Sequence, residues 1–187
     1  SKAPLSSLIA LLESSESSST QADLGEMIDL PTWGRFSAFE SLTQNQHVDD
    51  THNWRLYYDP WRQKFLPVVW DSMGWYDLLK HVRLHGLVGI EFGNEIISNR
   101  LMKALFQNGD FIRARSDALR LFFAGGKHQA FLRIVSETVR TMESEVRTDP
   151  FLLPTNPQIV IDHMRRMELI LSKVLTEKVD TFLDNDS

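Results

Sequence analysis

The stretch HVDDTHNWRLYYDPWRQKFLPVVWDSMGW, residues 47–75, decides the fold of the chain because it carries a clear strand signal. Two short runs rich in aromatic and β-branched residues, 54–58 and 65–70, flank the tetrapeptide DPWR at 59–62. Runs of this length and composition are typical of strands, and proline directly after aspartate is typical of a type I turn. The stretch therefore predicts a β-hairpin, in which Pro67 restricts the second strand to an edge or bulged position.

Side chains should alternate along the first strand of this hairpin. Because successive side chains point to opposite faces of a strand, Trp54, Leu56 and Tyr58 are predicted to share one face. Arg55 and Tyr57 are predicted to take the other face. The hairpin is therefore expected to be half exposed.

Polar side chains gather at the two ends of the hairpin. Those that enter the first strand or leave the second are His47, Asp49, Asp50, His52, Asn53 and Asp71. Because a hairpin brings its two ends together, the carboxylates and the amide before the first strand are expected to converge on Asp71. Carboxylate and amide oxygens suit Mg²⁺ or Mn²⁺ and the phosphates that such a metal carries. The alternative interpretation is that these residues only form turns and cap helices.

Composition places the chain among ordinary globular proteins. It has 187 residues, of which 42% are hydrophobic and 24% charged, enough for a sizeable core. The net charge of -5 argues against broad, non-specific binding to nucleic acid. No apolar run approaches the roughly 20 residues that a membrane-spanning helix needs. The absence of cysteine excludes disulfides and thiol catalysis.

Apolar residues at helical spacing predict that the rest of the chain is helical. The expected organisation is a single domain with a helical lead-in (1–46), a loop and hairpin that carry the site (47–75) and a helical region (76–187). In the lead-in, Thr32 is expected to cap a helix whose apolar side starts at Trp33. The predicted fold class is α+β, mainly α.

Helices fill the region after the hairpin. The sequence predicts them from Asn94 to Phe106, from Asp110 to the glycine pair at 125–126, over about 129–146 and over about 156–182. His81 and His85 stand four residues apart, as helical metal ligands do. Since no third ligand follows nearby, two surface histidines are the favoured interpretation.

The segment HNWRLYYDPWRQKFLPVVWD, followed by NEIISNRLMKALFQNGDFIRAR, resembles the spore coat protein H (CotH) kinase family. The resemblance covers roughly residues 24–150, and its most specific parts are 53–60 and 67–71. It implies a fold similar to the C-terminal lobe of an atypical protein kinase. It also implies an enzyme that uses ATP and a divalent metal, Mg²⁺ or Mn²⁺, to phosphorylate protein side chains. Members are often secreted or associated with outer spore layers, so an extracellular, cell-surface or spore-associated location is expected.

The resemblance also implies roles for the polar residues at the hairpin ends. Asp49, or Asp50 in its place, matches the catalytic-loop aspartate that positions or deprotonates the substrate hydroxyl. His47 matches the His-x-Asp order of kinase catalytic loops. Asn53 matches a strand-entry asparagine that helps to hold the metal, and Asp71 matches the metal-binding aspartate.

Two features depart from the family pattern. The family often has Trp-Asp-x-Asp, and here Met73 replaces the second aspartate and removes one carboxylate. A kinase also needs a glycine-rich loop and a Lys–Glu pair before its catalytic loop, yet the only lysine before Asp49 is Lys2. The chain is therefore expected to be the C-terminal part of such a protein. Alone, it is expected to bind Mg²⁺ or Mn²⁺ weakly through Asp49 and Asp71 and to transfer no phosphate.

Two other function classes remain open on the residues. One is a metal-dependent hydrolase, in which a bound Zn²⁺ or another transition metal activates water. Its ligands would be His47, Asp49 or Asp50, His52 and Asp71. The other is a non-catalytic structural or interaction module similar to a pseudokinase, which Met73 and the missing lysine favour. A kinase would have a protein substrate as its partner, and neither nucleic-acid binding nor a membrane span is expected.

Overall fold

The computed structural model describes residues 3–14, 18–43, 45, 54–70, 97, 99–151, 156–177 and 179. Contacts divide the chain into two compact units. Unit 1 comprises residues 1–74 and 93–120, and unit 2 comprises residues 75–92 and 121–187. The expected single domain stays a prediction.

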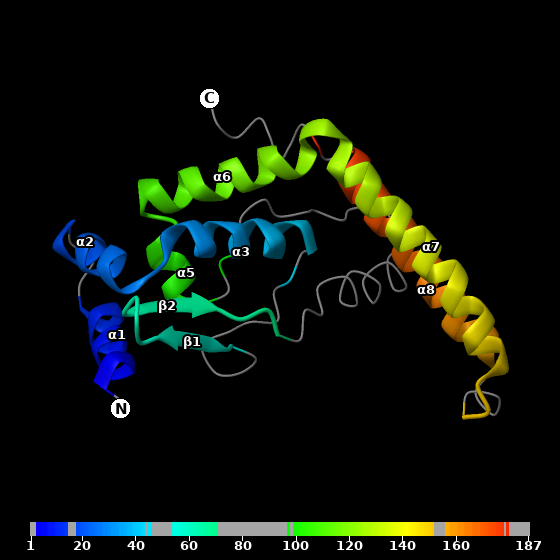
Figure 1. Cartoon of the computed structure of the whole chain (residues 1–187), viewed down its shortest axis with the longest axis horizontal. Helices are drawn as coiled ribbons and strands as arrows, with labels where there is room; N and C mark the ends of the chain where they lie inside the picture. Colours follow the sequence, from blue (N-terminus) through cyan, green and yellow to red (C-terminus); the bar gives the residue numbers. More distant parts are fainter. Residues whose placement is uncertain are drawn as a thin grey trace. The chain divides into compact units, whose positions relative to one another are not determined.

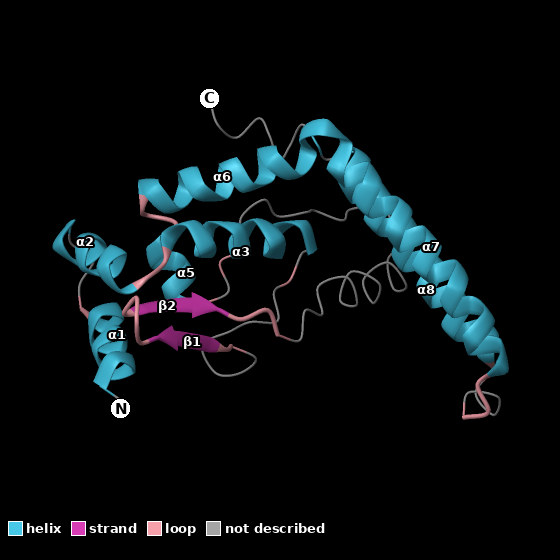
Figure 2. Ribbon diagram, viewed as in Figure 1, coloured by secondary structure: helices cyan, strands magenta, loops and turns pink. Residues whose placement is uncertain are grey.

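The described residues are mainly helical, with one small sheet (Figures 1 and 2). Unit 1 contains the strands β1 (Leu56–Asp59) and β2 (Lys64–Pro67) and the helices α1 (Ala3–Glu13), α2 (Ser18–Met27), α3 (Leu30–Thr43) and α5 (Arg100–Leu105). Helix α6 (Gly109–Phe123) begins in unit 1 and ends in unit 2. There it is followed by the short 3-10 helix η1 (Ala124–Gly126), α7 (Lys127–Thr148) and α8 (Pro157–Glu177). The predicted fold class, α+β and mainly α, is confirmed.

The predicted hairpin is present. β1 and β2 pair antiparallel, with Leu56 opposite Pro67 and Asp59 opposite Lys64. In the turn between them, the Asp59 carboxylate accepts hydrogen bonds from the backbone N–H groups of Trp61 (2.9 Å) and Arg62 (3.3 Å). An aspartate that caps the backbone two and three residues ahead stabilises a tight turn. The Asp-Pro signal in the sequence therefore marks the turn correctly.

The two faces of β1 also follow the prediction. Trp54, Leu56 and Tyr58 are half-buried and pack against the core of unit 1. Arg55 is exposed, and Tyr57 keeps 54% of its surface in solvent. The hairpin therefore lies with one face on the helices and one face outward.

Large apolar side chains from the helices and the hairpin form the core of unit 1. Its buried members are Leu8, Leu24, Ile28, Trp33, Phe36, Phe65, Leu101, Met102, Leu105 and Phe111. Helix α3 crosses α6 here at very short range. A Cβ atom at Gly34 would lie 2.7 Å from the Ala114 Cβ and from the Arg115 backbone nitrogen. Only glycine therefore allows this crossing.

Helix starts in unit 1 differ in detail from the prediction. Asp29, not Thr32, caps α3, since its carboxylate accepts from the Thr32 N–H at 3.0 Å. Asn99 caps α5 by accepting from the Met102 N–H at 2.9 Å, so the cap of this helix lies five residues after the expected cap Asn94. Threonine is a common cap by residue type, but Thr32 lies inside α3. Asp29 directly precedes the helix, and its carboxylate is three residues before the N–H group that it caps.

In unit 2, α7 and α8 lie side by side along their length (Figure 1). The Glu143 carboxylate of α7 accepts two hydrogen bonds from the Arg165 guanidinium of α8, one of them at 2.8 Å. The turn before α7 contains Gly125 and Gly126, both with positive φ (59° and 73°), so the glycine pair ends α6 as predicted. None of the described helices is long and apolar enough to cross a membrane.

Candidate functional site

The end of the hairpin at which the predicted site begins is closed by two contacts. The Val68 N–H donates to the Arg55 carbonyl at 3.1 Å, one step beyond the last strand pair. The Arg55 guanidinium then lies over the Trp70 ring, 5.4 Å from its centroid, a cation–π geometry. The chain that enters β1 and the chain that leaves β2 are therefore held together up to Trp70.

The residues predicted to form the site flank these two paired ends in the sequence. Asn53 directly precedes Trp54, and Asp71 directly follows Trp70. These two residues, together with His47, Asp49 and Asp50, lie outside the described part of the chain, as do His52, Met73, His81 and His85. Their predicted convergence and metal ligation stay predictions. Within the described ranges, no three His, Asp or Glu side chains form a group that could hold a metal.

Hydrogen bonds fix the hairpin to α3, the helix that precedes the predicted site in the sequence. The Trp33 indole N–H of α3 donates to the Phe65 carbonyl of β2 at 2.9 Å, and the Asp29 N–H reaches the same oxygen at 3.4 Å. Ile28 forms a parallel bridge with Phe65. β2 is thus held on one side by β1 and on the other by the segment that leads into α3.

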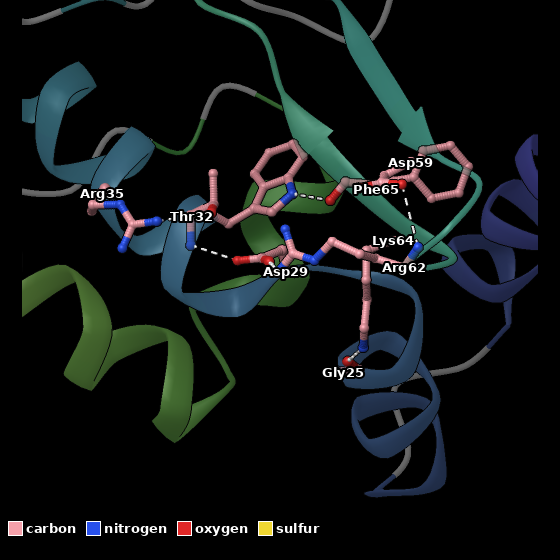
Figure 3. A network of polar contacts seen from close by, with 9 residues as sticks. Gly25, Asp29, Thr32, Arg35, Asp59, Arg62, Lys64 and Phe65 are labelled. Carbon is pink, nitrogen blue, oxygen red and sulfur yellow. Dashed lines mark hydrogen bonds and ion pairs between the residues drawn. The ribbon is translucent and has the colours of Figure 1, made fainter.

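The hairpin turn is tied to the start of the same helix (Figure 3). Asp29 is 7% exposed and forms an ion pair with the Arg62 guanidinium. Burial acts to raise the pKa of Asp29, but hydrogen bonds from Thr32 and the charge of Arg62 outweigh it, so the pKa is lowered. The Lys64 ammonium donates to the Gly25 carbonyl of α2 at 2.8 Å. Asp29 is therefore an ionised cap that joins the hairpin turn to α3.

The other end of α3 carries a buried polar group. Glu40 is fully buried, and its Oε1 accepts from the Asn45 side-chain amide at 3.1 Å. The Asn45 backbone N–H donates to the Glu40 carbonyl at 3.0 Å. Ser41 lies next to it, and its hydroxyl accepts from the buried Arg115 guanidinium of α6 at 3.0 Å. This cluster stands just before the segment that begins at His47.

Glu40 and Asp29 are not among the residues predicted from the sequence, although the sequence holds a signal for Glu40. The buried face of α3 combines aromatic and polar side chains: Trp33, Phe36, Ser37, Glu40 and Ser41. These positions follow helical spacing from Trp33. A glutamate seven residues after a buried tryptophan lies on the same helix face, and this spacing marks it as a buried carboxyl.

An open groove lies on unit 1 beside the first strand. It has a volume of about 580 Å³, and its lining includes Leu5, Ile9 and Leu12 of α1, Trp54 and Arg55 at the start of β1, and Arg100 of α5. Trp54 and Arg55 place this groove at the end of the hairpin where the predicted site begins.

Comparison of the sequence with known protein families gives a kinase-related class. The model of the CotH family, described as CotH kinase protein, matches residues 1–119. The chain therefore belongs to the CotH kinase family. The match ends beside the boundary of unit 1 at residue 120, so α7 and α8 lie outside it. No curated protein and no solved structure matches the chain.

Proposed function

We propose that this chain serves the transfer of phosphate from ATP to protein side chains, with Mg²⁺ or Mn²⁺ as the metal. Membership of the CotH kinase family is the observation that carries the proposal. The hairpin supports it, because its ends are held together at the contact of Arg55 with Trp70, one residue before Asp71. A C-terminal lobe similar to that of protein kinases is part of the proposal.

The proposed roles of the residues follow the motif. Asp49, or Asp50, accepts the proton of the substrate hydroxyl, and His47 orients that aspartate. Asp71 and Asn53 hold the metal, and their carboxylate and amide oxygens are the ligand types that Mg²⁺ and Mn²⁺ prefer. The metal neutralises phosphate charge when bound. An extracellular, cell-surface or spore-associated location fits the spore-coat name of the family.

Transfer of labelled phosphate from ATP to a protein mixture, with Mn²⁺ or Mg²⁺, tests the proposal. The assay uses both the chain of 187 residues and the complete product of its gene. If the complete product adds an upstream lysine and a phosphate-binding loop, we expect it to be active and to lose more than about 100-fold in Asp71→Ala, since the metal would lack its carboxylate. The exposed Asp117→Ala on α6 is the matched control. Metal-dependent transfer that survives in Asp71→Ala contradicts the assignment of the site.

The same assay separates the other two function classes. Zn²⁺-dependent hydrolysis without phosphate transfer would point to the hydrolase, because histidine ligands favour that metal. A folded complete product that binds no metal and transfers no phosphate would point to the non-catalytic module, for which the substitution of the second aspartate by Met73 is the supporting observation.

A further inference from the structure

Glu40 holds the exit of α3 with two hydrogen bonds to one residue. Its carboxyl Oε1 accepts from the Asn45 side-chain amide at 3.1 Å, and its backbone carbonyl accepts from the Asn45 N–H at 3.0 Å. Both residues are buried, Glu40 completely and Asn45 to within 1%. The second carboxyl oxygen, Oε2, has no hydrogen-bond partner among the residues that the structure describes.

Burial of the Glu40 carboxyl favours its neutral form. Burial raises the pKa of Glu40 to about 8, while the hydrogen bond from Asn45 acts in the opposite direction. At neutral pH the side chain is therefore protonated. Arg115 is the buried charged residue of α6, and its guanidinium donates to the Ser41 hydroxyl of α3 at 3.0 Å. The other charged side chains of α6, Asp110, Arg113, Asp117 and Arg120, are exposed.

The contact between Glu40 and Asn45 lies close in sequence to the predicted catalytic residues. α3 ends at Thr43, whose hydroxyl donates to the Phe39 carbonyl at 2.9 Å. Asn45 is fixed back onto Glu40, and the predicted catalytic segment begins only two residues later, at His47. Asn45 is thus the last described residue before this segment, and Glu40 holds it through both its side chain and its backbone.

We propose that Glu40 and Asn45 are positioning residues, which fix the point where the chain leaves α3 and so set the start of the segment that carries His47 and Asp49. This inference rests on the proposed function. Phosphoryl transfer depends on placement of the catalytic groups to within about 0.5 Å. A buried, neutral carboxyl that clamps the chain before them supplies such a constraint. A surface bond would not, because water competes for it.

The first experiment tests the neutral clamp without any activity. In the folded protein the Glu40 carboxyl stays protonated up to about pH 8, and in the unfolded chain it ionises near its ordinary value of 4.5. The stability that the neutral form contributes is thus complete below pH 4.5 and is lost as the pH rises to about 8. Glu40→Gln cannot ionise, so its Tm should exceed the wild-type Tm by a margin that grows from pH 5 to pH 8. The exposed Glu26→Gln is the control, and a constant margin for Glu40→Gln overturns the neutral clamp.

The second experiment asks whether the clamp positions the segment. Asn45→Ala removes the side-chain bond, so amide hydrogen exchange in residues 46–53 should rise about tenfold, while exchange in the strands at 56–67 stays unchanged. Glu40→Gln keeps an acceptor oxygen for Asn45 and should leave the exchange as in the wild type. Equal exchange in wild type and Asn45→Ala overturns the proposal, whether or not the protein transfers phosphate.

The third readout is the activity of the complete gene product. We expect Asn45→Ala to lower kcat at least tenfold with an unchanged KM for ATP, and Glu40→Gln to keep the wild-type kcat at pH 7. Above pH 8 the wild type should lose activity as Glu40 ionises, and Glu40→Gln should not. An unchanged kcat in a folded Asn45→Ala contradicts the positioning role. Absence of transfer in the wild type contradicts the proposed function instead, and the exchange experiment then decides the clamp by itself.

Discussion

Helix α3 of unit 1 and helix α7 of unit 2 bury very different side chains. Over 14 residues, α3 buries Trp33 and Phe36 together with Ser37, Glu40, Ser41 and Thr43. Over 22 residues, the described part of α7 buries only Val146. Burial of polar groups costs free energy unless each finds a defined partner. Unit 1, which the family model matches, thus buries polar side chains with defined partners, whereas unit 2 is built on a pair of amphipathic helices.

The largest effect should come from the close crossing of α3 with α6. Gly34→Ala places a methyl group 2.7 Å from the Ala114 Cβ and the Arg115 nitrogen, so the two helices must move apart. We expect a loss of about 3 kcal/mol of the free energy of unfolding, because extra atoms in a tight core cost about 1–3 kcal/mol or more. Urea denaturation measures it.

Gly25→Ala is the matched control in the neighbouring helix α2. Its new methyl group would meet only the Leu30 side chain, at 3.9 Å. Because alanine favours a helix over glycine by about 1 kcal/mol, this variant should be equally or more stable than the wild type. Equal stability of both glycine variants would mean that the crossing in unit 1 is not as restrictive as the geometry indicates.

A smaller effect is expected at the cap that ties the hairpin to α3. Asp29→Ala removes the cap of Thr32 and the ion pair with Arg62, and we expect it to cost about 1–2 kcal/mol, the usual value of a lost cap. Asp29→Asn retains an acceptor for the Thr32 N–H and should lose less. The lowered pKa of Asp29 means that this contribution is complete above its ordinary pKa of 3.8 and is lost as the pH falls below it. Thermal unfolding at pH 7 and at pH 3 measures both effects.

The smallest effect is expected in unit 2. The Arg165 guanidinium and the Glu143 carboxylate form a bidentate pair between α8 and α7, and Arg165 keeps more than half of its side chain in solvent. Because water and salt screen such a pair, Arg165→Gln should change Tm only slightly, and the change should vanish at 1 M salt. A Tm loss as large as that of Asp29→Ala would show that unit 2 also depends on specific polar contacts.

The sequence predicted the parts of the fold that local chemistry dictates. The Asp-Pro turn, the alternation from Trp54 to Tyr58 and the break at Gly125 depend only on neighbours in the chain, and the structure confirms them. Long-range partners were not predictable in this way. Asp29 caps α3 and also forms an ion pair with Arg62, which is 33 residues away in the sequence. Glu40 was missed because a charged residue in a helix is normally placed in solvent.

For the site, the sequence predicted residue types and the approach of the hairpin ends. The structure describes that approach as far as the contact of Arg55 with Trp70. The convergence of Asp49, Asn53 and Asp71 concerns residues outside the described ranges. It therefore stays a prediction that the metal-binding and phosphate-transfer experiments address.

The hydrogen bond from the Trp33 indole to the Phe65 carbonyl has a consequence for the order of folding. It joins residues 32 positions apart, whereas the strands of the hairpin pair across a turn of four residues, 60–63. Closing a long loop costs more chain entropy than closing a short one, so the hairpin is expected to form before it docks on α3. The loop closed by docking contains His47, Asp49 and Asn53. Closure of the loop that contains the proposed catalytic residues is therefore expected to be a late event in folding, because it requires the hydrogen bond between Trp33 and Phe65.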